Sequence, residues 1–144
     1  MTGTSDTGTT DTGSTHTGVA TDRLLAAARA RISLVDAPEA FRLQGEGATL
    51  VDTRPAAQRA EYGEIAGAVV VERNVLEWRL DPAGEHRLAD IDHDRPIVVF
   101  CQEGYASSLA VASLVDLGLI DVHDLAGGYA AWVDAGLPTR TRWE

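Results

Sequence analysis

Short apolar runs alternate along the chain with segments whose apolar positions recur every three or four residues. A run of four to eight mostly apolar residues bounded by turn-forming residues is typical of a buried strand. By this criterion we predict strands within 48–55, 67–73, 96–100 and 121–127. The run at 96–100 is the strongest, because it is continuous and apolar, as expected of a strand covered on both faces of a sheet.

The intervening segments have the composition and the stop signals of helices. Ala, Leu and Arg dominate 21–33, whereas 36–45 has a proline in its first turn and a glycine at its end. We predict further helices at 56–62, 74–81, 105–119 and 128–136. In the helix at 74–81, we expect Val75 and Trp78 to face the core, with Leu80 as a further candidate.

Strands that alternate with helices indicate an α/β domain with a mainly parallel sheet covered by helices. In such sheets, ligands bind at the carboxyl ends of the strands. Cys101 is the only cysteine of the sequence, and it lies between the strand at 96–100 and the helix at 105–119. It is therefore expected at the edge of the sheet where an α/β domain carries its chemistry.

The first twenty residues differ from the rest of the chain. They repeat Thr-Gly every five residues and contain almost no apolar side chain that folding could bury. A segment of this composition cannot offset the entropy that it would lose on ordering. We therefore predict a disordered Thr/Gly-rich tail at 1–20, followed by one domain at 21–144.

The formal net charge of -10 argues against nucleic acid or a membrane as partner, because both nucleic acids and anionic membranes repel an acidic surface. No apolar run approaches the roughly 20 residues needed to span a bilayer. The N-terminus lacks a basic region followed by an apolar stretch, so we expect a cytoplasmic protein. A single cysteine excludes an internal disulfide and a zinc site built from several cysteines.

Two interpretations of Cys101 are open from the residues alone. A lone cysteine after an apolar strand is commonly a packed, unreactive thiol. The next residues, however, turn sharply at Gly104 and continue with small side chains at 106–108 into a helix. A short loop at a helix N-terminus points its N–H groups inward, and these groups would stabilise a thiolate or a persulfide at the cysteine.

Four separated motifs together resemble single-domain members of the rhodanese family of sulfurtransferases. They occur in the order in which that family carries them, and the match covers about residues 34–140. The motifs are LVDTR (50–54), GEIAGAVVV (63–71), CQEGYASS (101–108) and DLAGGYAAWVDAGLP (124–138). The resemblance implies a rhodanese-like fold, which is a central parallel five-stranded sheet with helices on both faces.

The same resemblance implies a chemistry for the cysteine loop. Cys101 would attack the outer sulfur of a donor such as thiosulfate and become a persulfide. A thiol or cyanide-like acceptor, which could also be a thiol of a partner protein, would then take the sulfur, and no cofactor or metal is required. The loop residues expected to bind substrate are Gln102, Glu103, Gly104, Tyr105, Ala106 and Ser107. Arg73, at the end of the predicted strand at 67–73, is the candidate for a basic substrate-binding group near the pocket mouth, and an ordinary surface arginine is the equal alternative.

The loop departs from the family pattern in its charge. Many family members carry an arginine where this chain has Ala106, and members that use thiosulfate well tend to have basic loop residues. Here Gln102 and Glu103 follow the cysteine, and a carboxylate beside a thiol disfavours the thiolate and repels an anionic donor. We therefore expect thiosulfate to be a weak donor, with a neutral or protein-bound donor as the alternative.

Asp52 and Arg54 lie at the end of a predicted strand and are expected near the cysteine loop. In the family such a pair mostly organises loops through hydrogen bonds and an ion pair, for which Glu61 is a candidate partner, and contact with substrate is the alternative. The acidic segment 90–94 has the alternating spacing of a metal loop. It lacks the glycine and the distant glutamate of a calcium site, so we predict no metal there.

The residues of the cysteine loop also bear on three alternative functions. A phosphatase or arsenate reductase would need an arginine six positions after the cysteine to clamp a tetrahedral anion, and this position is Ser107. A non-enzymatic interaction module of the same fold often loses the cysteine, which is retained here. A persulfide relay to another protein's thiol is compatible with the acidic loop and stays open beside turnover of small molecules.

Overall fold

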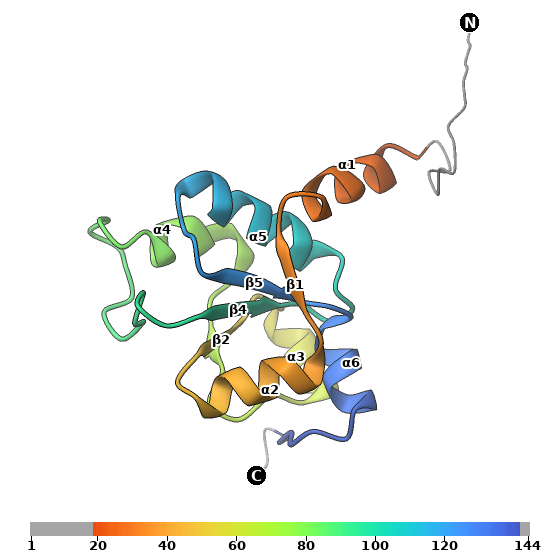
Figure 1. Cartoon of the computed structure of the whole chain (residues 1–144). Helices are drawn as coiled ribbons and strands as arrows, with labels where there is room; N and C mark the ends of the chain where they lie inside the picture. Colours follow the sequence, from red (N-terminus) through yellow and green to blue (C-terminus); the bar gives the residue numbers. More distant parts are fainter. Residues whose placement is uncertain (1–18, 142–144) are drawn as a thin grey trace, which may run out of the picture.

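The centre of the molecule is a five-stranded sheet in which every pair of neighbouring strands runs parallel (Figure 1). The computed structural model describes residues 19–141. The strands are β1 (Ser33–Val35), β2 (Thr49–Asp52), β3 (Val69–Val70), β4 (Ile97–Phe100) and β5 (Val122–Leu125). Their spatial order is β1-β5-β4-β2-β3, so that β4 lies in the middle. The predicted α/β fold with a parallel sheet of five strands is confirmed.

Helices cover both faces of this sheet (Figure 1). The α-helices are α1 (Ala20–Arg29), α2 (Ala37–Gly45), α3 (Ala56–Tyr62), α4 (Leu76–Leu80), α5 (Ala106–Leu117) and α6 (Gly128–Asp134), and a 3-10 turn, η1 (Arg73–Val75), precedes α4. In Figure 1, α1, α4 and α5 lie on one side of the sheet and α2, α3 and α6 on the other. Residues 1–18 of the predicted tail lie outside the described residues, so the tail stays a prediction.

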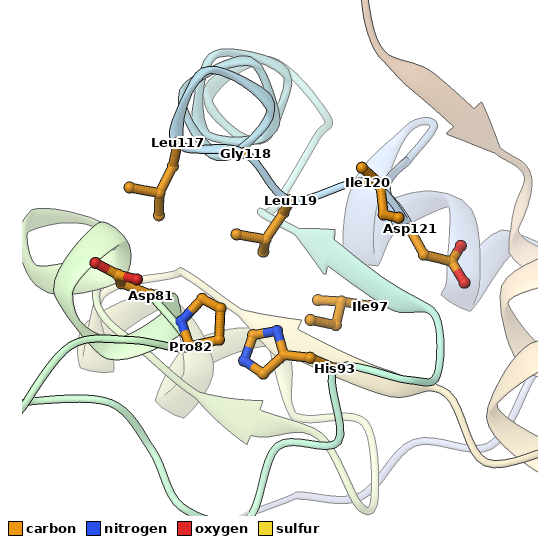
Figure 2. A pocket seen from close by; sticks show the side chains of 9 residues that line it. All are labelled: Asp81, Pro82, His93, Ile97, Leu117, Gly118, Leu119, Ile120 and Asp121. Atoms are coloured by element: carbon orange, nitrogen blue, oxygen red, sulfur yellow. The ribbon is translucent and has the colours of Figure 1, made fainter.

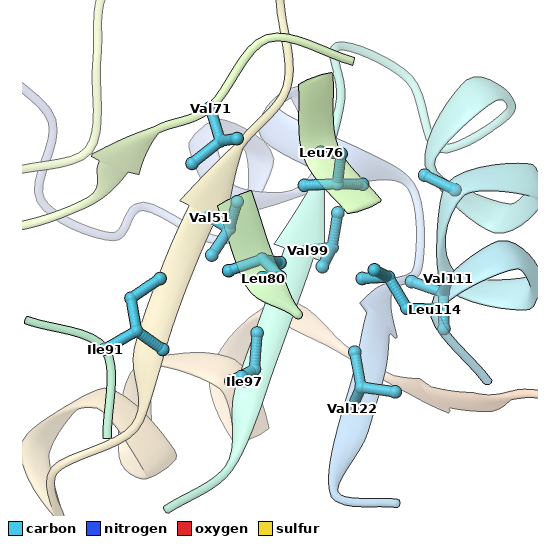
Figure 3. Close-up of a cluster of buried hydrophobic side chains, with 11 residues drawn as sticks. Val51, Val71, Leu76, Leu80, Ile91, Ile97, Val99, Val111, Leu114 and Val122 are labelled. Carbon is cyan, nitrogen blue, oxygen red and sulfur yellow. The ribbon is translucent and has the colours of Figure 1, made fainter. Parts of the chain in front are cut away.

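Side-chain alternation along β4 builds one core on each face, because successive residues of a strand point to opposite sides. Ile97 and Val99 face α4 and α5, whereas Val98 and Phe100 face α2 and α6. The first core, shown in Figure 3, consists of Val51, Val71, Leu76, Leu80, Ile91, Ile97, Val99, Ala110, Val111, Leu114 and Val122. The second consists of Ala37, Ala40, Leu50, Ile65, Val98, Phe100, Leu125, Tyr129 and Trp132. β4 is thus fixed from both sides, and with it the residue that follows Phe100.

The helix predicted at 21–33 ends earlier than expected, and the strand that follows it was not predicted. α1 ends at Arg29, one turn before the predicted end at residue 33. Soon after it comes β1, a three-residue strand at the edge of the sheet, next to β5. Leu34 of this strand is 43% exposed, so the segment has no strong apolar signal of its own. β1 becomes a strand through its pairing with β5, which lies about ninety residues later in the chain.

The predicted orientation of the helix at 74–81 was wrong for Trp78 and Val75, which are 60% and 40% exposed. Leu80, the further candidate, is fully buried. Leu76, which was not predicted, is also fully buried, as expected of a residue one helical turn from Leu80 on the same face. The larger aromatic side chain suggested the wrong face, because short helices carry too few residues for their periodicity to decide between two phases.

Candidate active site

Cys101 follows the last residue of β4, and its sulfur lies inside a loop of backbone N–H groups. The N–H groups of Gly104 and Ser107 donate to Sγ at 3.2 and 3.3 Å. The Ser107 hydroxyl lies 3.3 Å from the same sulfur. Cys101 is 8% exposed, so the thiol is largely shielded but not sealed from solvent. Such an arrangement stabilises negative charge on sulfur, because the N–H dipoles and the N-terminus of α5 point toward it.

Gly104 allows the loop to close around the sulfur. Its backbone has φ +92°, which L-residues with a side chain rarely adopt. A Cβ at this position would also lie 2.8 Å from the backbone nitrogen of Gly127. Glycine is therefore required both by the conformation and by the close approach of the next segment.

The start of α6 holds the outer side of the same loop. The N–H groups of Tyr129 and Ala130 donate to the carbonyl oxygens of Cys101 and Gln102 at 2.8 and 3.0 Å. These are first-turn N–H groups, which have no partner within their own helix. A Cβ on Gly128 would lie 2.5 Å from the Cys101 carbonyl oxygen, so the Gly-Gly sequence permits this contact. Because these loop carbonyls bond outward to α6, loop N–H groups can face the sulfur.

Arg54 supports the loop from the side of β2. Its guanidinium group donates to both carboxylate oxygens of Asp52, at 2.8 Å for the shortest contact, and both side chains are buried. Further hydrogen bonds reach the Gly63 carbonyl at 2.8 Å and Gln102 Oε1 at 2.9 Å. The guanidinium carbon also lies 4.2 Å from the centroid of the Tyr129 ring. A buried charge pair with this many hydrogen bonds is rigid, and Gln102 connects it to the cysteine loop.

Arg29 supports the loop from the opposite side and comes from α1. Its guanidinium group donates to the Gly104 carbonyl at 2.8 Å and to the Ser108 hydroxyl at 3.0 Å. It also lies over the ring of Tyr105, 5.8 Å from the centroid. Arg29 and Arg54 therefore both support the loop. Their hydrogen bonds go to protein groups, and neither arginine lines the cavity.

A buried carboxylate lies beneath the loop. Asp124 of β5 is fully buried and accepts hydrogen bonds from the hydroxyls of Ser107 at 2.6 Å and Ser108 at 2.5 Å. Burial raises the pKa of the Asp124 carboxyl, while the two serine hydroxyls and the charge of Arg29 act in the opposite direction and are outweighed. Asp124 thus binds a proton more readily than an exposed aspartate does.

A cavity of about 290 Å³ opens above the sulfur. Its lining residues are Gln58, Tyr62, Cys101, Gln102, Glu103, Tyr105 and Ala106. Among these described residues Glu103 carries the charge at neutral pH, and no basic side chain is present. An anion that enters the cavity therefore meets a carboxylate before it meets the N–H groups of the loop.

Six of the seven predicted substrate-binding residues lie around the sulfur. Gly104 and Ser107 donate hydrogen bonds to it, and Gln102, Glu103, Tyr105 and Ala106 line the cavity. Arg73 is not among the lining residues that the structure describes. It begins η1 and pairs with Glu77 at 3.0 Å, one turn away. Its guanidinium group is thus engaged by a neighbouring carboxylate.

Asp52 and Arg54 lie behind the loop rather than in the cavity. Arg54 is 1% exposed, and none of its hydrogen bonds in residues 19–141 goes to Glu61, the partner considered from the sequence. The arginine contacts the site through Gln102 instead. In the same described range, no group of three or more His, Cys, Asp and Glu side chains is placed to hold a metal ion. No helix among these residues has both the length and the apolar character to cross a bilayer.

Arg29, Ser108 and Asp124 belong to the site but were missed by sequence reasoning. Asp124 had a usable signal, since it occupies a position of a buried strand that faces α5, where apolar residues are expected. A charged residue there is rare unless it is paired or functional. Arg29 carried no such signal, because an arginine in a helix of mixed composition is ordinarily a surface residue.

A second cavity lies at the amino ends of the strands, the end of the sheet opposite to Cys101 (Figure 2). It is lined by Asp81, Pro82, His93, Ile97, Leu117, Gly118, Leu119, Ile120 and Asp121. Ile97 is the first residue of β4, so this cavity lies four residues before the cysteine along the same strand. It contains no part of the cysteine loop.

The fold and the site together define a class, the parallel α/β domains that hold a cysteine sulfur in a loop of backbone N–H groups at the end of the central strand. The chain belongs to the rhodanese-like domain family, whose model matches residues 36–135. The match begins at the residue before α2 and ends just after α6. α1 and β1 therefore precede the matched segment.

Similar proteins include several named sulfurtransferases. The thiosulfate sulfurtransferase GlpE of Actinobacillus succinogenes is 32% identical over 101 residues, which are 70% of this chain and 83% of that protein. A structure from Rhodopseudomonas palustris, described as a possible tyrosine phosphatase of unknown function, has a TM-score of 0.77 at 28% identity and covers 90% of this chain and 100% of that one. The polysulfide-sulfur transferase homodimer of Wolinella succinogenes has a TM-score of 0.68 at 26% identity, over 84% and 87% of the two chains.

Proposed function

We propose that this protein is a sulfurtransferase that carries a sulfane sulfur as a persulfide on Cys101. The observation that carries the proposal is the pair of N–H donors, from Gly104 and Ser107, on a sulfur at the base of an open cavity. Membership of the rhodanese-like family and similarity to proteins named sulfurtransferases support it. A merely packed cysteine would have no need of two backbone donors directed at its sulfur.

The reaction proceeds in two displacements at sulfur. The Cys101 thiolate attacks the outer sulfur of the donor, the bond between the two donor sulfurs breaks, and the remainder leaves with the electron pair. An acceptor thiolate or cyanide then attacks the outer sulfur of the persulfide. The sulfur–sulfur bond at Cys101 breaks, and the cysteine returns as a thiolate. No net oxidation or reduction of the protein occurs over the two steps.

Further loop N–H groups are available for the outer sulfur of the persulfide. The backbone N–H groups of Glu103, Tyr105 and Ala106 donate to no other group in the part of the chain that the structure describes. A persulfide anion extends the negative charge about 2 Å beyond Sγ, into the cavity. These three groups belong to the same loop, and we expect them to give the intermediate more donors than the resting thiolate has.

The donor is a thiol persulfide or a polysulfide rather than thiosulfate. Thiosulfate is a compact dianion, and the cavity offers it Glu103 and no basic side chain. The acidic protein, with a formal net charge of -10, adds an unfavourable long-range potential. Donors that carry one charge or none at the reacting end avoid most of this repulsion. The similar protein from Wolinella is named for polysulfide and the one from Actinobacillus succinogenes for thiosulfate, so the choice of donor rests on the charge of the cavity.

Phosphatase chemistry is not favoured, although one similar structure is described as a possible tyrosine phosphatase. The loop position that would need a clamping arginine is Ser107, whose hydroxyl points to Asp124. Arg29 and Arg54 bond to the outside of the loop, through the Gly104 carbonyl and Gln102. A phosphate in the cavity would thus lack the guanidinium that its transition state requires.

A protein thiol is the second candidate for the acceptor. Tyr62 and Tyr105 line the cavity and are 51% and 61% exposed, which leaves two aromatic rings at its mouth. Exposed aromatic residues are enriched where proteins contact one another. Delivery of the sulfur to a cysteine on a partner protein therefore fits this rim better than delivery to a small anion such as cyanide.

Intact mass spectrometry tests the proposal directly. The protein is incubated with polysulfide or with thiosulfate, desalted and weighed, with Cys101→Ser in parallel. We expect a gain of about 32 Da on the wild type and none on the variant. The fraction of the wild-type protein that carries this gain should be larger with polysulfide than with thiosulfate. If neither donor nor a thiol persulfide loads the wild type, the transferase proposal fails and a binding module remains.

A charge substitution tests the donor class in the same assay. Glu103→Gln is expected to increase loading by thiosulfate about fivefold, because removal of one nearby like charge is worth roughly 1 kcal/mol. Glu85→Gln makes the same charge change at a side chain that is 87% exposed and outside the cavity lining. Equal responses of the two variants would show that Glu103 does not select the donor.

A further inference from the structure

Three side chains form a continuous line of hydrogen-bonding atoms beneath the loop. Cys101 Sγ lies 3.3 Å from Ser107 Oγ, and Ser107 Oγ lies 2.6 Å from Asp124 Oδ1. Ser107 and Asp124 are both fully buried, so water does not replace either contact. The line therefore connects the sulfur to a carboxyl group inside the protein.

The single hydroxyl proton of Ser107 allows two arrangements along this line. In the first, the thiol donates to Oγ while the hydroxyl donates to the Asp124 carboxylate. In the second, both protons have moved one bond along: the hydroxyl donates to a Cys101 thiolate, and Asp124 is a neutral acid. Both arrangements have the same total charge, so their exchange requires no proton from solvent.

We propose that Ser107 and Asp124 are a proton relay that takes the thiol proton of Cys101 and so prepares the nucleophile. This inference rests on the proposed function, since the thiolate is what attacks the sulfur donor. Ser107 touches the reacting sulfur, whereas Asp124 acts through Ser107 and is a positioning residue and proton acceptor.

The step balances in protons and in charge. The S–H bond of Cys101 breaks as Ser107 Oγ takes its proton, and the hydroxyl proton of Ser107 passes to Asp124 Oδ1. The negative charge moves from the buried carboxylate to the sulfur. There it meets the N–H groups of Gly104 and Ser107, which face Sγ in the resting structure. The loop thus provides a favourable end point for the charge that leaves Asp124.

The surroundings of Asp124 suit an acceptor that must hold a proton. The residues opposite it on the neighbouring strands are Leu34 of β1 and Val99 of β4, both apolar. Among residues 19–141, it faces the hydroxyls of Ser107 and Ser108 from α5 and the charge of Arg29 from α1. Burial outweighs these favourable contacts and raises the pKa of Asp124, which lowers the cost of the neutral acid.

Ser108 supplies a matched control for Ser107. Its hydroxyl also donates to Asp124, at 2.5 Å, and it is equally buried. Its partners are Asp124, Arg29 and the Gly104 carbonyl, and no hydrogen bond connects it to the sulfur. Removal of Ser108 therefore disturbs the same carboxylate without cutting the line to Cys101.

Alkylation of Cys101 by iodoacetamide measures the thiolate without any sulfur donor. Rates are compared from about pH 6 to pH 9 for the wild type, Ser107→Ala, Asp124→Asn and Ser108→Ala. We expect the first two variants to react about tenfold more slowly near pH 6, with the difference shrinking toward pH 9, where solvent can remove the proton. Ser108→Ala should stay within about threefold of the wild type at every pH.

The double variant Ser107→Ala/Asp124→Asn sharpens the test. If the two residues act as one relay, the double variant reacts no more slowly than either single variant, because the line is already cut. Additive losses, or a loss that is the same at every pH, would overturn the relay and leave a structural role. Thermal unfolding of each variant identifies any that does not fold, and Ser107→Ala tests the relay even if Asp124→Asn is unstable.

The outcomes separate this inference from the proposed function. Slow alkylation of the variants together with sulfur loading of the wild type supports both. Normal alkylation of Ser107→Ala and Asp124→Asn overturns the relay, whatever the result of the mass experiment. A pH-dependent loss of alkylation without any sulfur loading of the wild type would uphold the relay as a property of the thiol and overturn the transferase.

Discussion

A cavity opens at each end of the parallel strands, and the two differ in the groups that converge on them. At the carboxyl end of β4, the first N–H groups of α5 and α6 meet the loop around Cys101. At the amino end, the last turn of α5 and the residues after it line the cavity. Figure 2 shows Leu117, Leu119 and Ile97 around that space.

The direction of the helices explains the difference. In a parallel sheet all helices run opposite to the strands, so their N-termini gather at the carboxyl ends of the strands. The N-terminus of a helix favours negative charge, and the C-terminus disfavours it. The amino-end cavity adds Asp81 and Asp121 to the C-terminus of α5, which makes it unsuitable for a thiolate or an anion. The cavity at Cys101 is the candidate site because of the N–H groups and the thiol that line it, and not because of its volume.

The largest effect is expected from the charge pair behind the cysteine loop. Arg54→Ala would leave the buried Asp52 carboxylate without its partner, at a cost of about 3–5 kcal/mol in the free energy of unfolding. Arg95→Ala removes one member of a pair at the amino end, whose side chains are 55% and 58% exposed, and should cost less than about 1 kcal/mol. Urea denaturation of the two variants gives both values.

The loop should respond to the same change. Because Arg54 donates to Gln102, we expect sulfur loading to fall in Arg54→Ala and to be unchanged in Arg95→Ala. Arg54→Lys keeps the charge without the planar set of donors, and is expected to recover stability only in part. If Arg54→Ala and Arg95→Ala lose equal stability, the contrast between the two ends of the sheet is wrong.

A glycine at each end provides the next comparison. Gly104→Ala meets a left-handed backbone, with φ +92°, and a contact of 2.8 Å with the Gly127 nitrogen, for which we expect a cost of about 2–4 kcal/mol. Gly118→Ala meets φ +116° but nothing within 4 Å, and should cost about 1–2 kcal/mol. Thermal or urea unfolding compares the two, and iodoacetamide reactivity of Cys101 should fall only in Gly104→Ala.

The smallest expected effect is the pH dependence that Asp124 gives to stability. Burial raises the pKa of Asp124 above its ordinary value of 3.8, so the folded state binds this proton more tightly than the unfolded state. Its contribution is therefore greatest in acid, below the unfolded pKa, and is lost as the pH rises through the folded pKa. The free energy of unfolding of the wild type relative to Asp124→Asn should fall over that range.

Urea unfolding of both proteins at several pH values between about 3 and 7 checks this sign. The other carboxyl groups are common to the two proteins and cancel in the difference. A difference that rises with pH would mean that Asp124 is stabilised as a carboxylate, which would also weaken its role as a proton acceptor.

Local features were predicted well from the sequence. Cys101, Gly104 and Ser107 lie within seven residues, and a strand, a glycine and a helix start bring them together in one loop. The strands β2, β3, β4 and β5 and the parallel arrangement were likewise indicated by apolar runs and by their alternation with helices. The patterns that predict these features lie in residues that are near one another in the chain.

Several contacts between distant segments were not predicted. β1 has three residues and an exposed leucine, and it is recognised only through its pairing with β5. Arg29 bonds to residues 75 and 79 positions later, which requires α1 to lie against α5. Trp78 was assigned to the core because its side chain is large and apolar, whereas Leu76 and Leu80 occupy the space against α5 and β4.

The sequence by itself determined the class of the domain, the position of its single cysteine and the acidic character of the loop beside it, because periodicity, glycine and charge act over a few residues. Only the tertiary structure decided which side chains support that cysteine. Parallel pairing of β4 with β5 brings Asp124 beneath Ser107, and packing of α1 on α5 brings Arg29 to the Gly104 carbonyl. Buried polar groups acquire their partners from the order of the strands, which no local pattern encodes.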